Sequence, residues 1–487
     1  MLKTGKFLVI LLVLVVLFTG CDFAPKLKMP EVSLPSKEKF PLSRKGGIKI
    51  KWGWWREFKN AELNHLIELA LKNNDDLKIA TARLEEVLAL AGLKKAQLFP
   101  ILGYKAQVSR TKIPENIENS IENLGMFLRI PIDIENPKNS YNILLSASYE
   151  LDFWGKLRNE KRSAIAKVLS VKAMQDVVKI TLVSGVATLY FNALTLKKQI
   201  KEAEKLEKKL KEILEYRKLQ KKFGMISEAE VYQAEANYQE VKNLVESLKE
   251  GLQRLKNNLA CLVGMSPKDL FEKEIKLNGS LPQDLKLPSM LPSDVLLNRP
   301  DIKMAEMELR SANFDIGVAK AMYFPSITLT GYSGSLSSDF DKLIKSDSFF
   351  WSLGAGISGP IFTFGRIKAR IKFAEAKKKE ALFNYLKTIR NAFKEVYDAF
   401  LAVSYTRKKL NIEKKKLSAL KKAFDVIKKQ YNNGLASRLM VLSAEAGVIK
   451  EKLNLIQLEN ELIKNYIYLY KTLGGGILIN EGRGRKK

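Results

Sequence analysis

The sequence predicts a mainly α-helical protein with a membrane β-barrel segment, built as a two-fold internal repeat. Three observations lead to this fold class: glycine landmarks recur at one fixed spacing, two helical stretches far exceed ordinary lengths, and four segments alternate apolar with polar residues. A fixed period is the signature of a repeat architecture. Alternation over roughly ten residues per segment is typical of strands that close a barrel in a membrane.

The chain begins with an export signal. Two lysines precede the apolar run 7–18, which is too short to span a bilayer and is typical of a signal peptide. The run is followed by Gly20-Cys21, which resembles a bacterial lipobox, where small residues precede a cysteine that is lipidated. An ordinary signal peptide with a chance cysteine is the alternative. We expect residues 1–20 to be removed and Cys21 to become the lipidated amino terminus.

Residues 21–50 are expected to form an extended tether behind the lipid. Prolines favour extended backbone, and they recur here at Pro25, Pro30, Pro35 and Pro41. Asp22 follows the modified cysteine, and in some bacteria an acidic residue at that position retains a lipoprotein at the inner membrane. The other cysteine, Cys261, stands alone in a helical stretch, so no disulfide framework is possible and a buried small residue is expected.

The repeat is defined by three pairs of glycines. Each pair is separated by 210 residues: Gly155 with Gly365, Gly224 with Gly434, and Gly264 with Gly474. The first copy covers residues 51–264 and the second covers 293–474. The proline-containing stretch 265–292 between the copies is expected to be an irregular linker, and 475–487 a flexible basic tail.

Each copy is expected to contain two long helices. Their predicted ranges are 155–222 and 227–264 in the first copy, and 366–431 and 436–473 in the second. The longer helix of each copy would span roughly 100 Å, and apolar residues recur in it at helical spacing. Such lengths indicate coiled-coil-like packing. Gly224 and Gly434 supply the reversals that fold each pair into an antiparallel hairpin.

Four segments are predicted to be strands, at about 99–112, 140–153, 324–335 and 349–362. Their alternation is expected of strands with one lipid-facing and one water-facing side. The alternative is a water-soluble sandwich, in which the same alternation hides the apolar groups, but the lipobox favours the membrane. Four strands cannot close a barrel, and an open edge is not viable in lipid. Three copies would supply about twelve strands, within the range of outer-membrane barrels.

Several short motifs resemble those of one protein family. They are Trp54-Trp55-Arg56-Glu57-Phe58, Asn74-Asp75-Asp76-Leu77, Ser148-Tyr149-Glu150-Leu151-Asp152-Phe153-Trp154-Gly155, Asn298-Arg299-Pro300-Asp301-Ile302, Phe324-Pro325-Ser326, Gly359-Pro360-Ile361-Phe362 with Gly365-Arg366, and Leu473-Gly474-Gly475-Gly476. Together they resemble the TolC-like outer-membrane efflux factors, specifically the NodT-type outer-membrane lipoproteins of RND efflux systems. The resemblance runs from Cys21 to about Gly476.

The resemblance implies an assembly and its partners. It implies a homotrimer with a twelve-stranded barrel among outer-membrane lipids and a long helical barrel in the periplasm. The partners would be a periplasmic adaptor (membrane fusion) protein and an inner-membrane RND-type pump. In the family the hairpin tips close the periplasmic end. The tip residues expected to contact the adaptor are Gly224, Ser227, Glu230, Gly434 and Ser437.

The second tip departs from the family at two positions. Many relatives carry an acidic residue where this chain has Ser443, and some carry a second one at the position of Met440. We therefore expect an apolar pore constriction formed by Leu439 and Met440, with Ser443 beside them, in place of an acidic ring. The alternative is that these residues only pack at the start of a helix.

The longest loop between strands, residues 112–139, is rich in acidic residues. If it forms the extracellular mouth, these residues would favour cations, whereas a solvated surface loop is the alternative. The acidic residues are Glu115, Glu118, Glu122, Asp133 and Glu135.

The sequence favours a conduit over an enzyme. Its only histidine, His65, is expected to be structural, and the sequence has neither a metal-ligand cluster of the His/Cys type nor a phosphate-binding glycine loop. We expect no enzyme activity, no cofactor and no metal. The net charge of +30 is spread along helices among glutamates, which argues against nucleic-acid binding. The resemblance implies the outer-membrane channel of a tripartite efflux system, a passive exit duct for small molecules such as drugs and toxic compounds. A type I secretion duct for proteins and a non-conducting structural envelope lipoprotein are the alternatives.

Overall fold

The structure, a computed structural model, describes most of the chain. The described residues are 21–36, 50–130, 135–272, 275, 277–282, 285–288, 295 and 299–477. The expected signal peptide, Asp133 and most of the expected tail therefore lie outside the described residues.

The chain divides into two compact units, and each takes segments from both sequence copies. We call the first the strand unit and the second the hairpin unit. The strand unit comprises Met1–Met29, Glu86–Val168 and Glu308–Leu382. The hairpin unit comprises Pro30–Glu85, Leu169–Met307 and Phe383–Lys487. The two compact units therefore do not coincide with the two copies of the sequence repeat.

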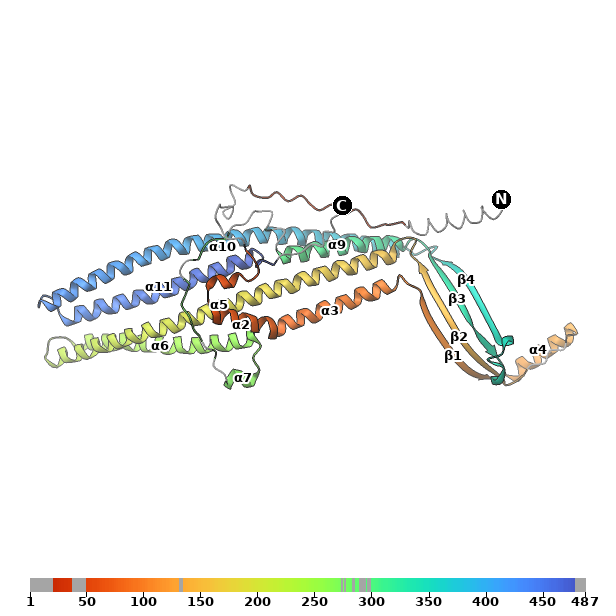
Figure 1. Cartoon of the computed structure of the whole chain (residues 1–487), viewed down its shortest axis with the longest axis horizontal. Coiled ribbons are helices and arrows are strands. Elements are labelled where there is room, and N and C mark those ends of the chain that lie inside the picture. Colours follow the sequence, from red (N-terminus) through yellow and green to blue (C-terminus); the bar gives the residue numbers. More distant parts are fainter. Residues whose placement is uncertain are drawn as a thin grey trace. The chain divides into compact units, whose positions relative to one another are not determined.

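The strand unit contains a four-stranded antiparallel sheet in the order β1-β2-β3-β4 (Figure 1). The strands are β1 (Ile101–Thr111), β2 (Lys138–Leu151), β3 (Ser326–Ser337) and β4 (Phe349–Ser358). The short 3-10 helices η2 (Phe340–Lys342) and η3 (Ser346–Ser348) join β3 to β4. Among the described residues β1 and β4 each pair with one strand only, so each has a free edge. The sheet confirms the four strands that the sequence predicts.

The register gives the sheet one apolar and one polar face. Residues directly opposite each other on neighbouring strands share a face. Pairs on the apolar face include Tyr104 with Leu145, Tyr149 with Leu329, and Ile327 with Ile357. Pairs on the polar face include Gln107 with Asn142, Ser148 with Thr330, and Ser326 with Ser358. The apolar face is exposed, as the large exposed fractions of Tyr104 (85%) and Leu353 (78%) demonstrate.

A helix within 112–139 corrects the expectation of a plain loop there. This helix, α4 (Glu115–Leu128), extends beyond the ends of the strands (Figure 1). Its apolar residues Ile117, Leu124 and Leu128 recur at helical spacing. Glu115 and Glu118 lie in its first turn, where negative charge stabilises a helix. The expectation considered only the charge of this stretch and missed its period.

The remaining elements are helices, and the longest confirm the predicted hairpins. α5 (Lys156–Lys222) and α10 (Arg366–Asn432) have 67 residues each, and they are followed by α6 (Glu228–Val263) and α11 (Arg438–Thr472). The shorter helices are η1 (Trp54–Phe58), α2 (Ala61–Asn73), α3 (Asp75–Ala96), α7 (Pro267–Glu272) and α9 (Pro300–Ala321). Among the described helices, α5 alone has an 18-residue window apolar enough to cross a membrane. That window is 56% buried, as expected of a core helix.

The landmark glycines explain why the repeat is visible in the sequence. All six have a positive φ, between 69° at Gly224 and 85° at Gly474. Side chains other than glycine rarely adopt this left-handed conformation. The copies therefore share glycine before the start of α5 and α10 and after the end of all four long helices.

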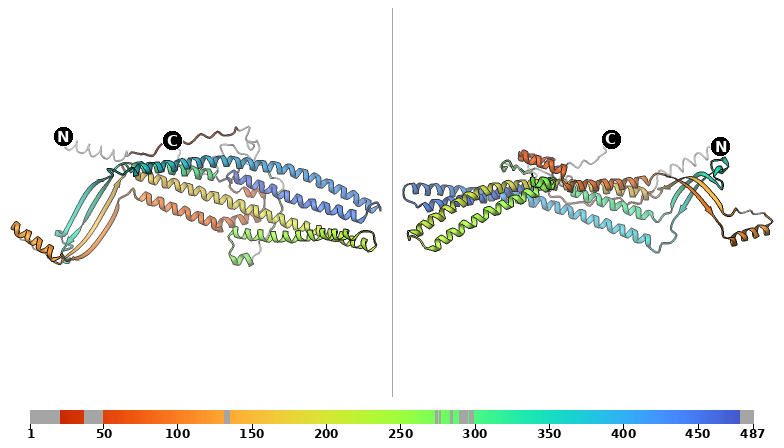
Figure 2. Two further views of the ribbon diagram at one scale, coloured as in Figure 1. Left: turned by 180° about the vertical axis from the view of Figure 1, so that it is seen from behind. Right: turned by 90° about the horizontal axis from the view of Figure 1, so that it is seen from below.

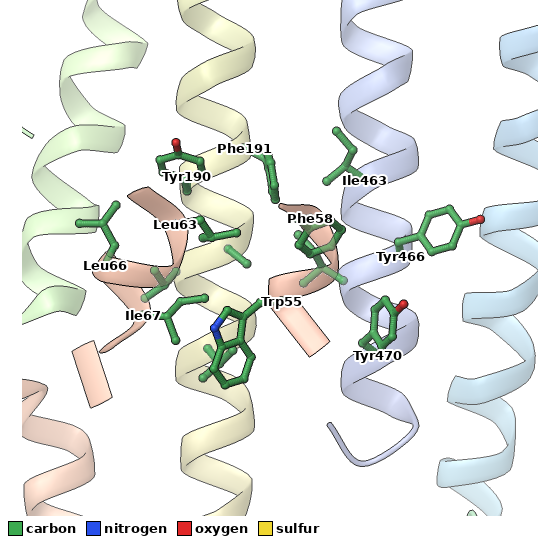
Figure 3. Close-up of a cluster of buried hydrophobic side chains, with 14 of the residues drawn as sticks. Trp55, Phe58, Leu63, Leu66, Ile67, Tyr190, Phe191, Ile463, Tyr466 and Tyr470 are labelled. Atoms are coloured by element: carbon green, nitrogen blue, oxygen red, sulfur yellow. The ribbon is translucent and has the colours of Figure 1, made fainter. Parts of the chain in front are cut away.

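The largest core lies in the hairpin unit. Trp54, Trp55 and Phe58 of η1 and Leu63 of α2 pack against α5 and α11 (Figure 3). Trp54 stacks on Tyr470, with 4.8 Å between the ring centroids. The aromatic motif at 54–58 is thus a core element that joins the amino-terminal segment to both long hairpins.

The arginine motif at 298–302 also has a structural role in the hairpin unit. The buried Arg299 guanidinium donates hydrogen bonds to Asp301 (2.6 Å), to Glu395 of α10 (2.7 Å) and to the Thr472 carbonyl of α11 (2.7 Å). Burial opposes its charge, but the contacts with both carboxylates outweigh it and raise the pKa of Arg299. The motif therefore ties the start of α9 to two other helices.

Two side chains that the sequence placed in structural positions are exposed. Cys261 lies on the outer face of α6, while its neighbours Leu259 and Ala260 are buried. His65 lies on the exposed face of α2, and no described residue hydrogen-bonds to its ring. Both expectations were wrong because composition alone does not fix the orientation of a helix.

Replacing Tyr470 with Phe is expected to improve tolerance of alkaline pH. Burial raises the pKa of Tyr470 to about 12 from 10, so its neutral phenol stabilises the fold below pH 10, and this stabilisation is lost as the pH rises to 12. The variant keeps the ring on Trp54 and should avoid a loss of about 2 kcal/mol. Unfolding followed between pH 10 and 12 tests this, with the exposed Tyr405→Phe as control. Equal losses in all three proteins would contradict the assignment.

Candidate functional site

The hairpin tips lie at the same end of the hairpin unit (Figure 2). At the first tip Gly224 N–H donates to the Lys221 carbonyl (2.8 Å) and Met225 N–H donates to the Gln220 carbonyl (2.9 Å). At the second tip Gly434 and Leu435 make the equivalent bonds, of 2.9 and 2.8 Å, to the carbonyls of Tyr431 and Gln430. This pair of bonds is a Schellman motif, which satisfies the last carbonyls of a helix before the chain reverses.

The two tips differ in how the returning helix begins. At the first tip the Glu230 carboxylate accepts a hydrogen bond from the Ser227 N–H (3.2 Å), which completes a capping box. At the second tip Ser437 accepts from the Met440 N–H (3.3 Å), but Met440 occupies the position equivalent to Glu230 and offers no carboxylate. The start of α11 is therefore less well capped than the start of α6.

Ion pairs further stabilise the first tip. Glu228 pairs with Lys221 (2.5 Å) and accepts from the Tyr232 hydroxyl (3.2 Å), while Glu230 pairs with Arg217 (3.6 Å). The hydrogen bond from Lys221 lowers the pKa of Glu228. The first tip is thus held by acidic residues that the second tip lacks.

The expected constriction residues are accessible in the chain. Met440 is 49% exposed, Ser443 is exposed and Leu439 is half-buried, whereas Val441 and Leu442 between them are buried. Val441 and Leu442 therefore pack at the start of α11, whereas Met440 does not. Leu435 at the turn is also exposed and adds to the apolar character of this tip.

Ion pairs that the sequence did not reveal join the two hairpins near their tips. Lys209 of α5 contacts both Glu212 (3.0 Å) and Glu445 of α11 (3.3 Å), and Glu212 also pairs with Arg438 of α11 (3.6 Å). Burial opposes the charge of Lys209, but its hydrogen bonds to the two glutamates raise its pKa. The sequence displays charges on each helix but not which helices become neighbours.

One carboxylate is buried, although the sequence singled out no buried acid. Glu451 of α11 is 3% exposed and pairs with Lys416 of α10 (2.5 Å). Burial opposes its charge, but contacts with Glu413, Lys416 and Asn454 outweigh it and lower the pKa of Glu451. The pair fastens α10 to α11. Among the described residues no three His, Cys, Asp or Glu side chains are grouped to hold a metal ion.

The structure brings only part of the acidic mouth together. Glu118 is engaged by the Asn136 amide, and Asn136 also bonds to both backbone groups of Ile113 (2.8 and 2.9 Å), which closes the base of the loop. Glu115 and Glu135 are exposed. Glu122 lies within α4, but its side chain is not among the described ones, and Asp133 lies outside the described residues.

A cavity of about 860 Å³ lies in the strand unit at the polar face of the sheet. Of its strand residues, Glu150, Ser326 and Ser358 belong to that face and Leu151 to the apolar face, and α10 adds Arg366 and Arg370. The polar face is thus continuous with a basic surface where the strands end and the helices begin. This surface was missed because its members are far apart in the sequence.

These features define a class of protein: a channel wall with a two-faced membrane sheet and long helical hairpins. The outer membrane efflux protein family matches residues 66–265 and 291–475. The chain therefore belongs to the outer membrane efflux protein family. It is an outer-membrane channel component of an efflux system, as the resemblance implied.

Similarity to individual proteins extends over almost the whole chain. The toluene efflux pump outer membrane protein TtgI of Pseudomonas putida is 31% identical over 471 residues, which are 95% of this chain and 97% of that protein. The cation efflux system protein CusC of Escherichia coli K12 is 30% identical over 463 residues, 94% of this chain and 97% of that protein.

Solved structures confirm the fold. The Campylobacter jejuni CmeC outer membrane channel superposes with a TM-score of 0.84 at 26% identity, covering 95% of this chain and 96% of that one. The open state of the Neisseria gonorrhoeae MtrE outer membrane channel gives 0.79 at 28% identity, covering 94% and 98%. The outer-membrane location is thus supported by sequence and by fold.

Substitutions at the capping positions are expected to weaken the first tip and to stabilise the second. Glu230→Met removes the capping box and should weaken the first turn of α6 by about 1 kcal/mol, whereas Met440→Glu should stabilise the first turn of α11 by a similar amount. Hydrogen exchange of the amides in these turns measures both effects. If neither exchange rate changes, the tips do not differ in capping.

Proposed function

We propose that the chain forms a homotrimeric, passive exit duct of a tripartite efflux system. The free edges of β1 and β4 are the observation that carries this proposal. Unpaired edges are not viable in lipid, and four strands are too few to close a barrel. Three copies joined edge to edge supply about twelve strands in a closed rotational assembly.

The proposed cargo is small molecules, with little selection by this chain. TtgI and CusC are named for toluene and for cations, yet they resemble this chain almost equally. Relatives with such different cargoes support selection by a partner, with the duct wall discriminating by size and charge. Protein secretion and a structural spacer have no comparable support, and a spacer would not need a two-faced sheet. We propose no enzymatic role, because the family is a transport component.

The proposed partners are a periplasmic adaptor and an inner-membrane RND-type pump. The exposed tips would contact the adaptor through the turns and helix starts at Gly224, Ser227, Glu230, Gly434 and Ser437. The ends of the duct would be narrowed at the second tips, where Leu439, Met440 and Ser443 from three copies would meet. An apolar ring excludes water and so closes a pore to ions. Cys21 would carry the lipid that anchors each copy in the outer membrane.

Replacing Leu439 and Met440 with Ser is expected to open the duct. The polar side chains would wet the constriction, so the purified trimer should show several-fold higher conductance in planar bilayers. Light scattering of the detergent-purified protein establishes the trimer first. Met225→Ser, an exposed apolar residue of the first tip, serves as the matched control and should leave conductance unchanged.

Two outcomes would contradict the duct. A monomer in detergent would remove the argument from the sheet edges. A trimer that never conducts, with or without substitutions at the second tip, would favour the structural envelope lipoprotein.

Neutralising the acidic mouth is expected to reduce preference for cations. Glu115→Gln together with Glu135→Gln removes exposed charge near the proposed exit and should lower the cation-to-anion permeability ratio, measured from reversal potentials in a salt gradient. Glu118→Gln should have a smaller effect, because that carboxylate is half-buried beside Asn136, whereas Glu115 and Glu135 are exposed. Glu235→Gln on α6 is the control, and unchanged selectivity in the double variant would refute a role for the mouth.

A further inference from the structure

The first described residues, Cys21–Pro25, lie on the strand unit in a site built by α5 and α9. The Cys21 carbonyl accepts a hydrogen bond from Arg158 (3.3 Å), and the Pro25 carbonyl accepts one from Asn313 (2.7 Å). Arg158 is itself held by Asp152, at 3.0 Å. The segment is therefore fixed at both ends, and one of the two side chains that hold it, Arg158, is oriented by Asp152.

Asp22 is held to its surroundings by several hydrogen bonds. Its carboxylate accepts hydrogen bonds from the Ala24 N–H (3.1 Å), from Asn159 (2.9 Å) and from the Arg162 guanidinium, with which it forms an ion pair. Burial opposes its charge, but the bonds from Asn159, Ala24 and Arg162 outweigh it and lower the pKa of Asp22. Asn159 is fully buried, so one of these donors is fixed by packing.

Aromatic stacking extends the site. The Phe23 ring stacks on Phe324 at 4.7 Å and 9°, and Trp154 stacks on Phe324 at 4.6 Å and 21°. The Trp154 indole N–H donates to the Pro325 carbonyl (2.7 Å), which fixes the stack to the start of β3. The motif residues Trp154, Phe324 and Pro325 therefore form part of the surface on which Phe23 rests.

Glycine at two positions leaves room for the segment. A Cβ at Gly317 of α9 would lie 2.9 Å from the Ala24 nitrogen and 2.8 Å from the Asn159 amide nitrogen. A Cβ at Gly155 would lie 2.7 Å from the Cys21 carbonyl oxygen. Contacts this close would displace the backbone of the segment or its partners. The helices thus have small residues where the segment crosses them.

We propose that this surface is a docking site for the acylated amino terminus, with Asp22 as its positioning residue. We call it the amino-terminal seat and define it by Arg158, Asn159, Arg162, Asn313 and Gly317. Cys21 lies beside Gly155, directly after the end of β2 at Leu151. The seat therefore holds the acyl chains at the level where the apolar face of the sheet ends. From there they enter the membrane leaflet that surrounds this end of the sheet. This role rests on the proposed lipidation of Cys21.

The seat gives Asp22 a role other than that of a sorting signal. A carboxylate bound to Asn159 and Arg162 stabilises the folded channel, and its partners are as necessary as Asp22 itself. A residue that acted only on sorting would need no partner on α5. The two roles therefore predict different behaviour for variants of Arg162.

Trypsin cleavage of the full-length trimer, solubilised from the outer membrane in detergent so that the protease reaches the periplasmic side, tests the seat. Lys26 and Lys28 directly follow the docked segment Cys21–Pro25, and cleavage after either of them releases the lipid anchor. Asp22→Ala and Arg162→Ala should each accelerate this cleavage roughly tenfold, as expected for the loss of one charged hydrogen bond. The double variant should be no faster than Asp22→Ala, because that substitution already removes the partner of Arg162. Asp22→Asn, which keeps an acceptor oxygen, should be intermediate.

Two further variants separate a local effect from misfolding. Gly317→Ala changes no charge but crowds Ala24, so it should also accelerate cleavage. Lys167→Ala removes an exposed charge of α5 outside the seat and should leave the rate unchanged. Each variant is compared only as an intact trimer. Equal cleavage rates in the natural chain, Asp22→Ala, Arg162→Ala and Gly317→Ala would overturn the proposal.

Mass spectrometry and membrane fractionation distinguish the seat from the other proposals. An amino-terminal peptide without acyl chains would contradict lipidation, while the effect of Arg162→Ala on cleavage would still show whether the segment docks. Relocation of Asp22→Ala between membranes, with normal location and normal cleavage of Arg162→Ala, would make Asp22 a sorting signal and overturn the seat.

Discussion

The need to hydrogen-bond every strand edge within lipid is the constraint on which the rest of the structure depends. One chain supplies four strands with an exposed apolar face and free edges at β1 and β4. Neither edge is satisfied within the described chain, and lipid offers no donors or acceptors. The sheet is therefore stable only as part of a larger closed assembly.

Duplication made much of this fold predictable from sequence. The left-handed glycines recur because Schellman reversals at Gly224 and Gly434 need that conformation. The strands were predictable because a membrane sheet must alternate, and the registers of the three neighbouring strand pairs keep the apolar residues on one face. In both cases a local rule acts on neighbouring residues, and local rules are visible in a single sequence.

Features that depend on distant partners were not predictable. Lys209 and Glu445 carry ordinary helix charges, and only packing makes them partners across two hairpins. The same holds for the cavity at the polar face and for the amino-terminal seat, whose residues come from separate parts of the chain. The exposed Cys261 and the helix α4 illustrate a second limit, because residue type alone fixed neither orientation nor helical period. At the second tip, the sequence indicated apolar residues but not the missing capping box.

The unequal tips have a consequence for stoichiometry. In the proposed trimer, three chains would present six helical turns around the axis, nearly alike in backbone but alternating between the acidic start at Glu230 and the apolar start at Met440. A partner that recognises only the backbone shape of the tips would find six equivalent binding positions. A partner that recognises their charge would find three. Divergence of a single side chain after duplication is thus enough to convert pseudo-sixfold symmetry into true threefold symmetry, and so to set how many partner subunits a channel recruits.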